Sequence, residues 1–458
     1  MDKQVEIKVE DLEEAVTYHT EAFLSPEYAK AEDEKLWSKV WQMAGRVEDI
    51  PDVGDFFTYN ILNESIIIIR IAPNELKAFY NVCPHRGRQL VSVPDNVNSV
   101  RGKKKNFVCG FHGWTYDLKG ENTYILDKED WKGALDEKSR TCLSELKVDT
   151  WQGWVYINMD PDCEPLRDFL EPAASILDHF EFEKMRYKWR QWAVYPCNWK
   201  TAIEAFMEPY HVAGTHTQLL KYGNYYAYSK AYGKHGVSGF DERDPSMKMA
   251  QAGSVSRAGL GDPRVSTYEL ARENYETVNF AASTDTLVNA ASRLKDELPE
   301  GTPAGEVIAH WMASARADDA ARGVIWPEIP PEVMAEAGLA WSMFPNQNIL
   351  QGVTFALCYR TRPYGDDPNK CIFEAYALER FPEGDAPETD WVHAEPTSDK
   401  WGLVLQQDFA NMEFVQKGMK SRGFRGTLPN PHQERKVTNF HRVLSQYMGT
   451  GSPQVLDK

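Results

Sequence analysis

The sequence has fewer basic than acidic residues, and it lacks several motifs that define common function classes. Its 51 Lys and Arg residues are outnumbered by 68 Asp and Glu, so the formal net charge is -17. That excess argues against nucleic acid or an anionic membrane as the main partner. There is no Gly-rich nucleotide fingerprint, so we do not expect the chain to bind NADH or flavin itself. There is also no internal repeat.

Long apolar runs are missing as well. The longest run, around Ile66–Ile69, is far too short to cross a bilayer and predicts a buried strand. The opening residues, MDKQVEIKVEDLEEAV, are acidic and contain no apolar core of a signal peptide. Seven cysteines, an odd number spread over 458 residues, argue against a disulfide framework. We therefore expect a cytoplasmic protein whose cysteines fill cores or bind metal.

Three zones of different pattern divide the chain, and its length predicts two or three domains. Residues 1–42 predict N-terminal helices that pack on the larger domain. Residues 43–155 contain short β-rich runs separated by turns, which predict a small antiparallel domain. Residues 156–458 mix helical and strand-like stretches. Within them, residues 236–340 are rich in Ala, Gly, Asp and Pro and predict an insertion into this larger domain, near the entrance of its pocket.

Individual elements can be predicted within the third zone. Helical patterns cover residues 165–181, 198–212, 265–296, 303–321 and 400–421. Strand-like patterns cover RYKWRQWAVYP, NILQGVTFALCYRTRP and CIFEAYALERF, and the last two are expected to pair as antiparallel neighbours. The chain is therefore predicted to have an α+β fold.

A soft metal site is predicted inside the β-rich zone. Cys83 and His85 form the first half of the motif, and Cys109 and His112 form the second, each at the tip of a predicted hairpin. The 23 residues between the halves allow the chain to run out and return. Two Cys and two His suit a tetrahedral zinc ion, and they equally suit a [2Fe–2S] cluster with Cys on one iron and His on the other.

Glycines around these motifs favour the iron–sulfur alternative. Gly87, Gly110 and Gly113 lie beside the candidate ligands, where glycine lets backbone N–H groups approach the sulfides. Neither half of this motif has the His–His spacing of a zinc finger. Between the two halves, the basic run Arg101-Gly-Lys-Lys-Lys105 suits either docking of an acidic ferredoxin or a solvated hairpin tip.

A second metal site is predicted in the segment NWKTAIEAFMEPYHVAGTH, residues 198–216. Non-haem Fe(II) that must bind O2 prefers two His and one carboxylate on one face. His211 and His216 would point about 140° apart on a regular helix. A break is therefore required, and Gly214 is expected to supply it, while Pro209 also argues against an unbroken helix. The flanking Phe206, Met207, Leu219 and Leu220 are candidates for the pocket wall, or for ordinary core.

Together, the two motifs resemble those of the Rieske non-haem iron oxygenases, the aromatic ring-hydroxylating family, in its catalytic alpha subunit. The resemblance implies an antiparallel β Rieske domain followed by a catalytic domain whose antiparallel sheet wraps around helices. It also implies that Cys83 and Cys109 hold the inner iron of the cluster, and that His85 and His112 hold the outer one.

The same resemblance implies the ligands of a mononuclear Fe(II). His211 and His216 match the family's two histidines, and Glu208 occupies the place of the carboxylate that bridges the two metal centres. This family usually has Asp there. The third ligand is expected three residues before an Asn on a late helix, which selects Asp408, with Glu413 as the fallback.

Family members assemble as trimers, so the resemblance implies a homotrimer, with or without a small β subunit. His112 of one subunit would then hydrogen-bond to Glu208 of the next, and electrons would come from a separate reductase or ferredoxin. The implied reaction uses O2 to hydroxylate an aromatic substrate by dihydroxylation, monohydroxylation or oxidative demethylation.

Two alternatives remain at this stage. One is a monooxygenase of a quaternary amine or another non-aromatic substrate, held by an aromatic cage. The candidate cage residues are Tyr222, Tyr225, Tyr226, Tyr228 and Tyr232, which a tyrosine-rich buried strand also explains. The other is an electron-transfer iron–sulfur protein without catalytic iron.

Overall fold

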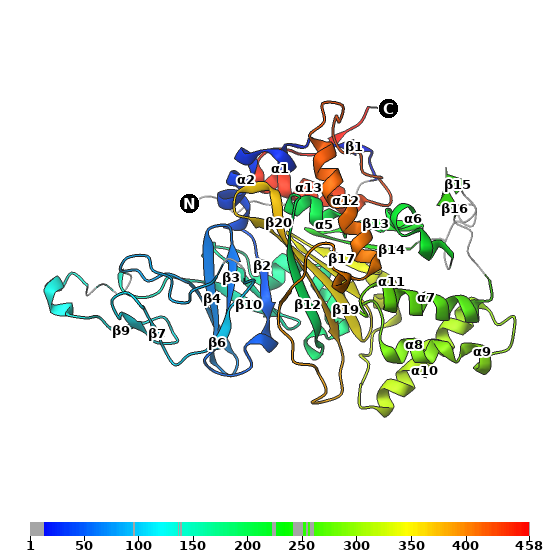
Figure 1. Ribbon diagram of the computed structural model, residues 1–458, viewed down its shortest axis with the longest axis horizontal. Coiled ribbons are helices and arrows are strands. Elements are labelled where there is room, and N and C mark those ends of the chain that lie inside the picture. Colours follow the sequence, from blue (N-terminus) through cyan, green and yellow to red (C-terminus); the bar gives the residue numbers. More distant parts are fainter. Residues whose placement is uncertain are drawn as a thin grey trace. The chain divides into compact units, whose positions relative to one another are not determined.

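The computed structural model describes residues 13–94, 97–135, 137, 140–221, 226–240, 251–252, 255–256 and 261–457. It divides into two compact units (Figure 1). The first is Lys30–Phe169, and the second contains the described residues before Lys30 and from Leu170 onward. The first unit therefore extends beyond the sequence-based borders of 43 and 155. Its two ends are tied together because the Trp41 indole N–H donates to the Glu164 carbonyl at 2.8 Å.

The first unit is built from antiparallel strands. Its main sheet has the order β2-β11-β10-β5-β4-β3-β6, and a smaller sheet has the order β7-β8-β9. The predicted buried strand is β4, in which Ile66–Ile69 are fully buried. The bounds are β2 Gln42–Arg46, β3 Asp55–Ile61, β4 Glu64–Ala72, β5 Glu75–Tyr80, β6 Arg101–Lys103, β7 Phe107–Val108, β8 Thr115–Tyr116, β9 Asn122–Tyr124, β10 Glu145–Trp151 and β11 Trp154–Asn158. The predicted small antiparallel domain is confirmed.

The second unit contains an eight-stranded sheet of order β13-β14-β17-β18-β19-β20-β12-β21. All neighbours are antiparallel except β12 and β21. The bounds are β12 Arg186–Tyr195, β13 Ala227–Tyr232, β14 His235–Phe240, β17 Ala340–Met343, β18 Gln347–Gln351, β19 Phe355–Tyr364, β20 Asp367–Glu379 and β21 Val392–His393. The predicted pairing of β19 with β20 is confirmed.

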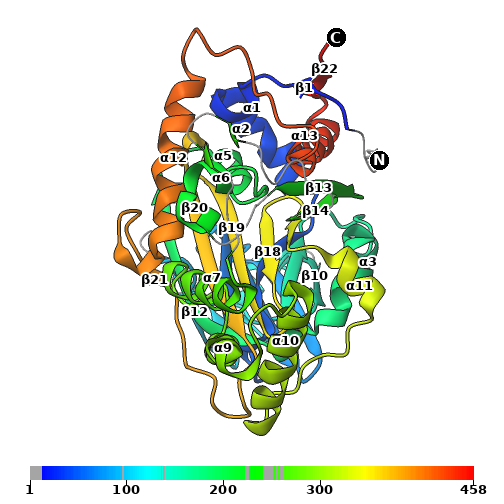
Figure 2. The same ribbon diagram turned by 90° about the vertical axis from the view of Figure 1, so that its right-hand side faces the viewer.

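Helices cover this sheet, which confirms the α+β prediction for the larger domain. Helix α5 packs on β19 and β20, α12 contacts α5, and α13 packs on β13 and β14 (Figure 2). The bounds of the helices in this unit are α1 Glu21–Leu24, α4 Ala173–Leu177, α5 Trp199–Glu204, α6 Val212–Thr215, α12 Leu403–Met419 and α13 Arg435–Met448. Two more helices, α2 Pro26–Glu32 and α3 Leu166–Leu170, contain the residues at which the chain passes between the two units. Before α1, β1 (Val16–Thr17) pairs with β22 (Gln454–Val455). No helix among the described residues is long and apolar enough to cross a bilayer.

The segment predicted as an insertion lies between two neighbouring strands. Strands β14 and β17 pair directly, and the chain between them contains α7 Pro263–Thr277, α8 Asp285–Ser292, α9 Leu294–Glu297, α10 Ala304–Ala321 and α11 Pro331–Ala337. Helices α7, α8, α9 and α10 contact one another and form one cluster (Figure 1). The predicted helix over 265–296 is thus three helices. Asn279 and Phe280 break it with positive φ angles, and the Thr284 side chain caps the start of α8.

Candidate metal centres

The two Cys–His loops of the first unit repeat one backbone pattern. In each loop a glycine N–H donates to the Cys carbonyl, Gly87 to Cys83 at 2.9 Å and Gly113 to Cys109 at 3.0 Å. Both glycines have φ of +73°, a conformation that L side chains rarely adopt, although a Cβ would meet no atom within 4 Å. Glycine is therefore required at both positions by backbone geometry rather than by lack of space. Gly110 has no such φ.

The four candidate ligands form two pairs. The Cys83 and Cys109 side chains are buried, while the His85 and His112 rings are half-buried with centroids 4.6 Å apart. Among the described residues, three donor atoms of His, Cys, Asp or Glu lie within 4.8 Å of one another at His211, His216 and Asp408. The four residues of the Cys–His loops do not form such a group. A single tetrahedral ion needs all its donors at one point, whereas a [2Fe–2S] cluster separates its Cys and His ligands onto different irons. The arrangement fits the cluster and disfavours zinc.

Two aromatic residues support this site, Trp114 at the end of the second motif and Tyr116, which the sequence analysis missed. The Tyr116 hydroxyl lies 3.0 Å from the Cys83 sulfur, and the Trp114 ring stacks on His85 with centroids 4.8 Å apart. Burial, then the charges of His112 and Arg86, lower the pKa of His85, so its ring is neutral near pH 7 and able to bind metal. A tyrosine hydroxyl beside a ligand sulfur is an expected hydrogen-bond donor to the cluster.

The basic run near this site is only partly available for docking. Arg101 donates to Asp49 at 3.0 Å, and Lys103 pairs with Asp52 at 3.0 Å. Lys104 and Lys105 are exposed. Docking of an acidic ferredoxin at this run stays a prediction.

The second candidate site begins at helix α5. The Asn198 side chain accepts the Lys200 N–H at 3.0 Å, and its amide donates to the Phe23 and Pro368 carbonyls, which fixes the start of the helix. The helix ends at Glu204, before Pro209. The prediction that Gly214 breaks the helix was wrong. Gly214 lies inside the one-turn helix α6, because the chain has already left the helical path after Glu204, ten residues earlier.

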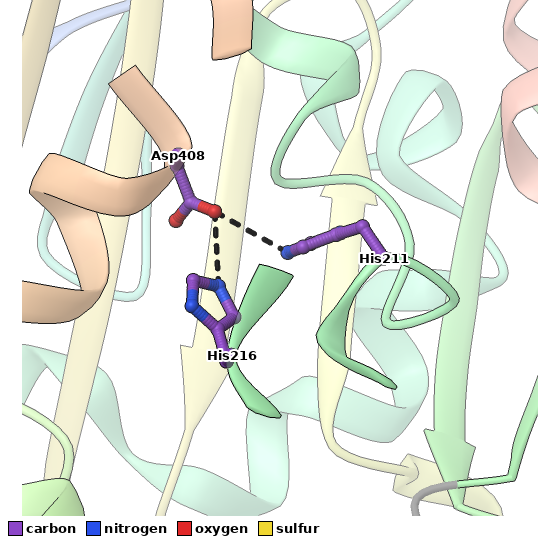
Figure 3. Close-up of side chains that lie close together, drawn as sticks. All are labelled: His211, His216 and Asp408. Atoms are coloured by element: carbon purple, nitrogen blue, oxygen red, sulfur yellow. Dashed lines mark ion pairs between the residues drawn. The ribbon is translucent and has the colours of Figure 1, made fainter. Parts of the chain in front are cut away.

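His211 and His216 occupy the two ends of α6, and Asp408 approaches them from α12. The Asp408 Oδ1 atom lies 2.9 Å from Nε2 of His216 and 3.5 Å from Nε2 of His211 (Figure 3). The three ligand atoms lie within 4.8 Å of one another. The structure thus brings Asp408 close to His211, although the two residues are 197 positions apart in the sequence. Glu413 is elsewhere, paired with Lys417 at 2.5 Å on the surface.

The other nitrogen of each imidazole is held by a second side chain. Glu208 Oε1 lies 2.9 Å from Nδ1 of His211, and Glu208 Oε2 accepts the His211 backbone N–H at 2.9 Å. Gln407, which the sequence analysis missed, places Oε1 2.8 Å from Nδ1 of His216. An amide oxygen only accepts, so His216 carries its proton on Nδ1 and presents a free Nε2 to Asp408. Both rings are therefore oriented for a metal between them and Asp408.

The residues present fit a mononuclear iron. Two His and one carboxylate on one face are the ligand set of non-haem Fe(II) oxygenases. Donors adjacent in an octahedron, each about 2.1 Å from the metal, stand about 3 Å apart, close to the observed 2.9 and 3.5 Å. Burial alone would lower the pKa of His211, but hydrogen bonds and charge from Glu208, with Asp408, raise it to about 9. The site therefore favours positive charge at this ring.

A cavity of about 220 Å³, here called the triad chamber, adjoins these three residues. Its wall is mostly apolar and includes Phe206, Leu219, Phe240, Phe355, Leu357 and Tyr359. Met207 and Leu220, the other two candidates, are buried elsewhere. Asn274, Val278 and Ala282 of the insertion also line it. Apart from Glu208 and the triad, no described lining residue is titratable except Tyr359.

A second cavity, of about 390 Å³, lies on another side of Glu208, which is the one described residue that lines both. Its other lining carboxylates are Glu204 and Glu434, and no described Lys or Arg lines it. Burial, then the charge of Glu208, raises the pKa of Glu434 to about 7. Nearby, burial lowers the pKa of the Lys436 ammonium to about 7, against the attraction of Glu208. Glu208 thus connects the triad chamber to an acidic cavity.

The triad chamber is not lined by the described members of the predicted tyrosine cage, which are Tyr226, Tyr228 and Tyr232. Tyr226 stacks on His432, the Tyr228 ring lies against Gly239, and the Tyr232 hydroxyl donates to Glu336 at 2.6 Å. Tyr222 and Tyr225 lie outside the described residues.

Two family profiles match the chain. The profile described as the Rieske [2Fe-2S] domain matches residues 40–130. The profile described as the ring hydroxylating alpha subunit, catalytic domain, matches residues 181–450, more than half of the chain.

Curated relatives match in part. The carnitine monooxygenase oxygenase subunit of Escherichia coli strain K12 is 31% identical over 188 residues, 40% of this chain and 48% of that protein. The benzene 1,2-dioxygenase subunit alpha of Pseudomonas putida is 28% identical over 261 residues, 51% of this chain and 53% of that protein. The matched stretches thus span about half the length of these relatives.

Solved structures share the fold over nearly the whole chain. Naphthalene 1,2-dioxygenase with indole bound has a TM-score of 0.65 at 18% identity and covers 99% of this chain and 96% of its own. A quaternary ammonium Rieske monooxygenase in complex with L-carnitine has a TM-score of 0.62 at 19% identity and covers 96% and 99%.

The family profiles and the two donor sets lead to one assignment. Proteins with these two domains carry a Rieske [2Fe–2S] cluster and a mononuclear iron, and the Cys–His pairs and the His–His–Asp triad fit those groups. The chain belongs to the ring-hydroxylating alpha subunit family, with a Rieske [2Fe–2S] domain ahead of the catalytic domain.

Proposed function

We propose that this chain is the terminal oxygenase component of an O2-dependent enzyme that hydroxylates an aromatic substrate. The proposed ligands are Cys83, His85, Cys109 and His112 for the cluster, and His211, His216 and Asp408 for the mononuclear iron. When bound, the cluster supplies single electrons and the iron supplies O2 activation. The observation that carries the proposal is the convergence of the triad within 4.8 Å beside an apolar cavity.

The chain's own residues would prepare this chemistry. Glu208 and Gln407 hold the outer nitrogens of His211 and His216, so both Nε2 atoms stay directed at one point. The apolar wall, including Phe206 and Leu357, excludes water and positions an uncharged ring. Dihydroxylation, monohydroxylation and oxidative demethylation are all compatible with this arrangement.

The wall of the triad chamber favours an uncharged substrate. A betaine carries a carboxylate as well as a quaternary ammonium, and a buried carboxylate needs a cationic or hydrogen-bonding partner. No described Lys or Arg lines the chamber, so the neutral side chains of Ser238, Asn274, Gln351 and Tyr359 are the hydrogen-bond donors that its described wall offers besides the triad. An aromatic hydrocarbon has no such requirement.

A quaternary amine is the second candidate, because relatives named as carnitine and glycine betaine monooxygenase subunits are each 31% identical over 188 residues. Phe206, Phe240, Phe355 and Tyr359 would then have to supply the aromatic contacts with the cation. Binding of trimethylammonium compounds would favour this candidate.

For the assembly we propose a homotrimer, with or without a small β subunit, supplied by a separate reductase or ferredoxin. His112 of one copy would approach Glu208 of the next. The acidic cavity supports this route, because Glu208 lines it as well as the triad chamber. Mixing a His112→Ala variant with a His216→Ala variant should restore activity in mixed trimers, and no recovery would contradict the route.

The reaction itself is tested by single turnover. Reduced, iron-loaded protein would be exposed to labelled O2 with toluene, indole, carnitine and glycine betaine. We expect labelled product from the aromatic compounds. Label in the amine products alone would replace the aromatic proposal with the second candidate.

A further inference from the structure

A third cavity, of about 340 Å³, lies in the insertion and is here called the insertion chamber. Helices α7, α8, α10 and α11 and the turn between β18 and β19 line it. Its apolar wall includes Leu270, Leu287, Ile308, Trp311, Met312 and Trp326. None of its described lining residues is charged. The chamber therefore suits an uncharged, apolar group.

The insertion chamber adjoins the triad chamber. Asn274, Ala282, Gln351 and Phe355 line both cavities and form the partition between them. Two of these residues come from the insertion and two from the β18–β19 region. The two cavities are therefore neighbours across one layer of side chains.

The partition is held by specific contacts. The Gln351 amide donates to the carbonyls of Ala337 at 2.7 Å and Gly338 at 3.1 Å, which anchors it to the start of β17. The Phe355 ring lies directly against the backbone of Gly352, where a Cβ would collide with it. Phe355 itself is only half-buried. A molecule that occupies both chambers must therefore pass beside the half-buried Phe355 ring.

The volumes indicate that the triad chamber is only part of a substrate site. Small-molecule pockets usually measure about 300–1,000 Å³. The triad chamber, at about 220 Å³, is below that range, and together the two chambers reach it. An enzyme gains orientation and rate when non-reacting parts of the substrate also bind.

We propose that the insertion chamber binds the non-reacting apolar arm of the substrate, while the ring to be hydroxylated occupies the triad chamber. The substrate class is then an uncharged aromatic molecule with an apolar substituent or a further ring. Residues on α7 and α10, including Thr267 and Met312, would set its permitted length. This inference rests on the proposed function for the position of the reacting ring.

The test measures binding without turnover. The affinities of toluene, butylbenzene and hexylbenzene for the iron-loaded protein would be measured under nitrogen by equilibrium dialysis. Each methylene buried in the insertion chamber should tighten binding about fourfold. Affinity independent of chain length would overturn the proposal.

Variants locate the effect. Thr267→Trp, which fills the chamber, should remove the length dependence and leave toluene affinity within about twofold. Ser266→Trp, at the adjacent half-buried position on α7 outside both cavities, should keep the dependence of affinity on chain length. Met312→Ala, which enlarges the chamber, should extend the dependence to longer chains. Equal behaviour of the two tryptophan variants, or no change in Met312→Ala, would contradict the assignment.

Binding and turnover, measured on the same protein, test this inference and the proposed function separately. Length-dependent binding without labelled oxygen in any product would leave the two-chamber site standing and overturn the oxygenase proposal. Labelled product with length-independent binding would leave the oxygenase proposal standing and overturn the two-chamber site.

Discussion

Gln407 is predicted to control iron affinity without touching the metal. Its Oε1 atom lies 2.8 Å from Nδ1 of His216 and also accepts from the Gln218 amide at 2.9 Å. Gln407→Leu removes the acceptor that fixes the His216 tautomer. Such outer partners change metal affinity about 10–100-fold. One neutral buried hydrogen bond contributes about 0.5–1.5 kcal/mol, so we expect the lower end, a loss of about tenfold.

The assay is competition for Fe(II) between the protein and a chelator under nitrogen, with the Rieske absorption as an internal measure of the first unit. Gln407→Glu keeps an acceptor and should bind iron at least as tightly as wild type. Gln406→Leu is the matched control, because the Gln406 amide donates to the Ser398 carbonyl at 2.9 Å instead. Wild-type iron affinity in Gln407→Leu, or an equal loss in Gln406→Leu, would refute the reasoning.

Three further predictions follow from the same structure. Tyr116→Phe should lower the cluster's reduction potential by about 60 mV, which corresponds to a hydrogen bond to Cys83 that is about 1.4 kcal/mol stronger in the reduced state. Tyr124→Phe, on the exposed end of β9, should leave the potential unchanged. An unchanged potential of Tyr116→Phe in redox titration would show that Tyr116 does not act on the cluster. Asp408→Ala should leave two irons per chain with an intact Rieske spectrum, and three irons on analysis would contradict its role. Lys436→Met should raise the free energy of unfolding at pH 7 by at most about 4 kcal/mol, because the folded pKa of about 7 lies below the ordinary 10.5 and the wild-type protein gains stability as pH rises between them. Loss of the hydrogen bond from Lys436 Nζ to the Ala340 carbonyl, 3.1 Å long, reduces this gain. In denaturant titrations the gain should fall as pH rises toward 10.5, and a pH-independent gain would contradict this account.

Much of the candidate site could be proposed from the sequence, because most of its residues are local in sequence. The pairs Cys83–His85 and Cys109–His112 carry recognisable spacing, and so does the pair His211–His216. Asp408 required the family pattern, since nothing within the α12 sequence distinguishes it from Glu413. Its position beside both histidines comes from packing of α12 on α5, which a local pattern does not encode.

The features that were missed depend on tertiary contacts. Gln407 and Tyr116 act through one hydrogen bond each, and neither residue type has a sequence signature for that role. Gln407 did carry one weak signal, its position directly before Asp408. The break assigned to Gly214 was wrong because α5 ends at Glu204 and the chain passes Pro209 before α6 begins.

The insertion chamber also depends on tertiary contacts that the sequence does not show. The composition of residues 236–340 indicated an insertion, but not that its helices would enclose a chamber of about 340 Å³ beside the triad. The three described tyrosines of the predicted cage do not line the triad chamber, for a related reason. The described tyrosines of the β13 region find separate partners, such as His432 for Tyr226 and Glu336 for Tyr232.

The most direct test of the central claim is one anaerobic experiment on protein replete with iron and sulfide. The chemically reduced chain would receive labelled O2 with and without an alkylbenzene, and both the visible absorption of the cluster and the product would be measured. The account predicts a Rieske spectrum, reoxidation that depends on substrate, and labelled oxygen in the product. The absence of a Rieske spectrum, or product oxygen derived only from water, would contradict it.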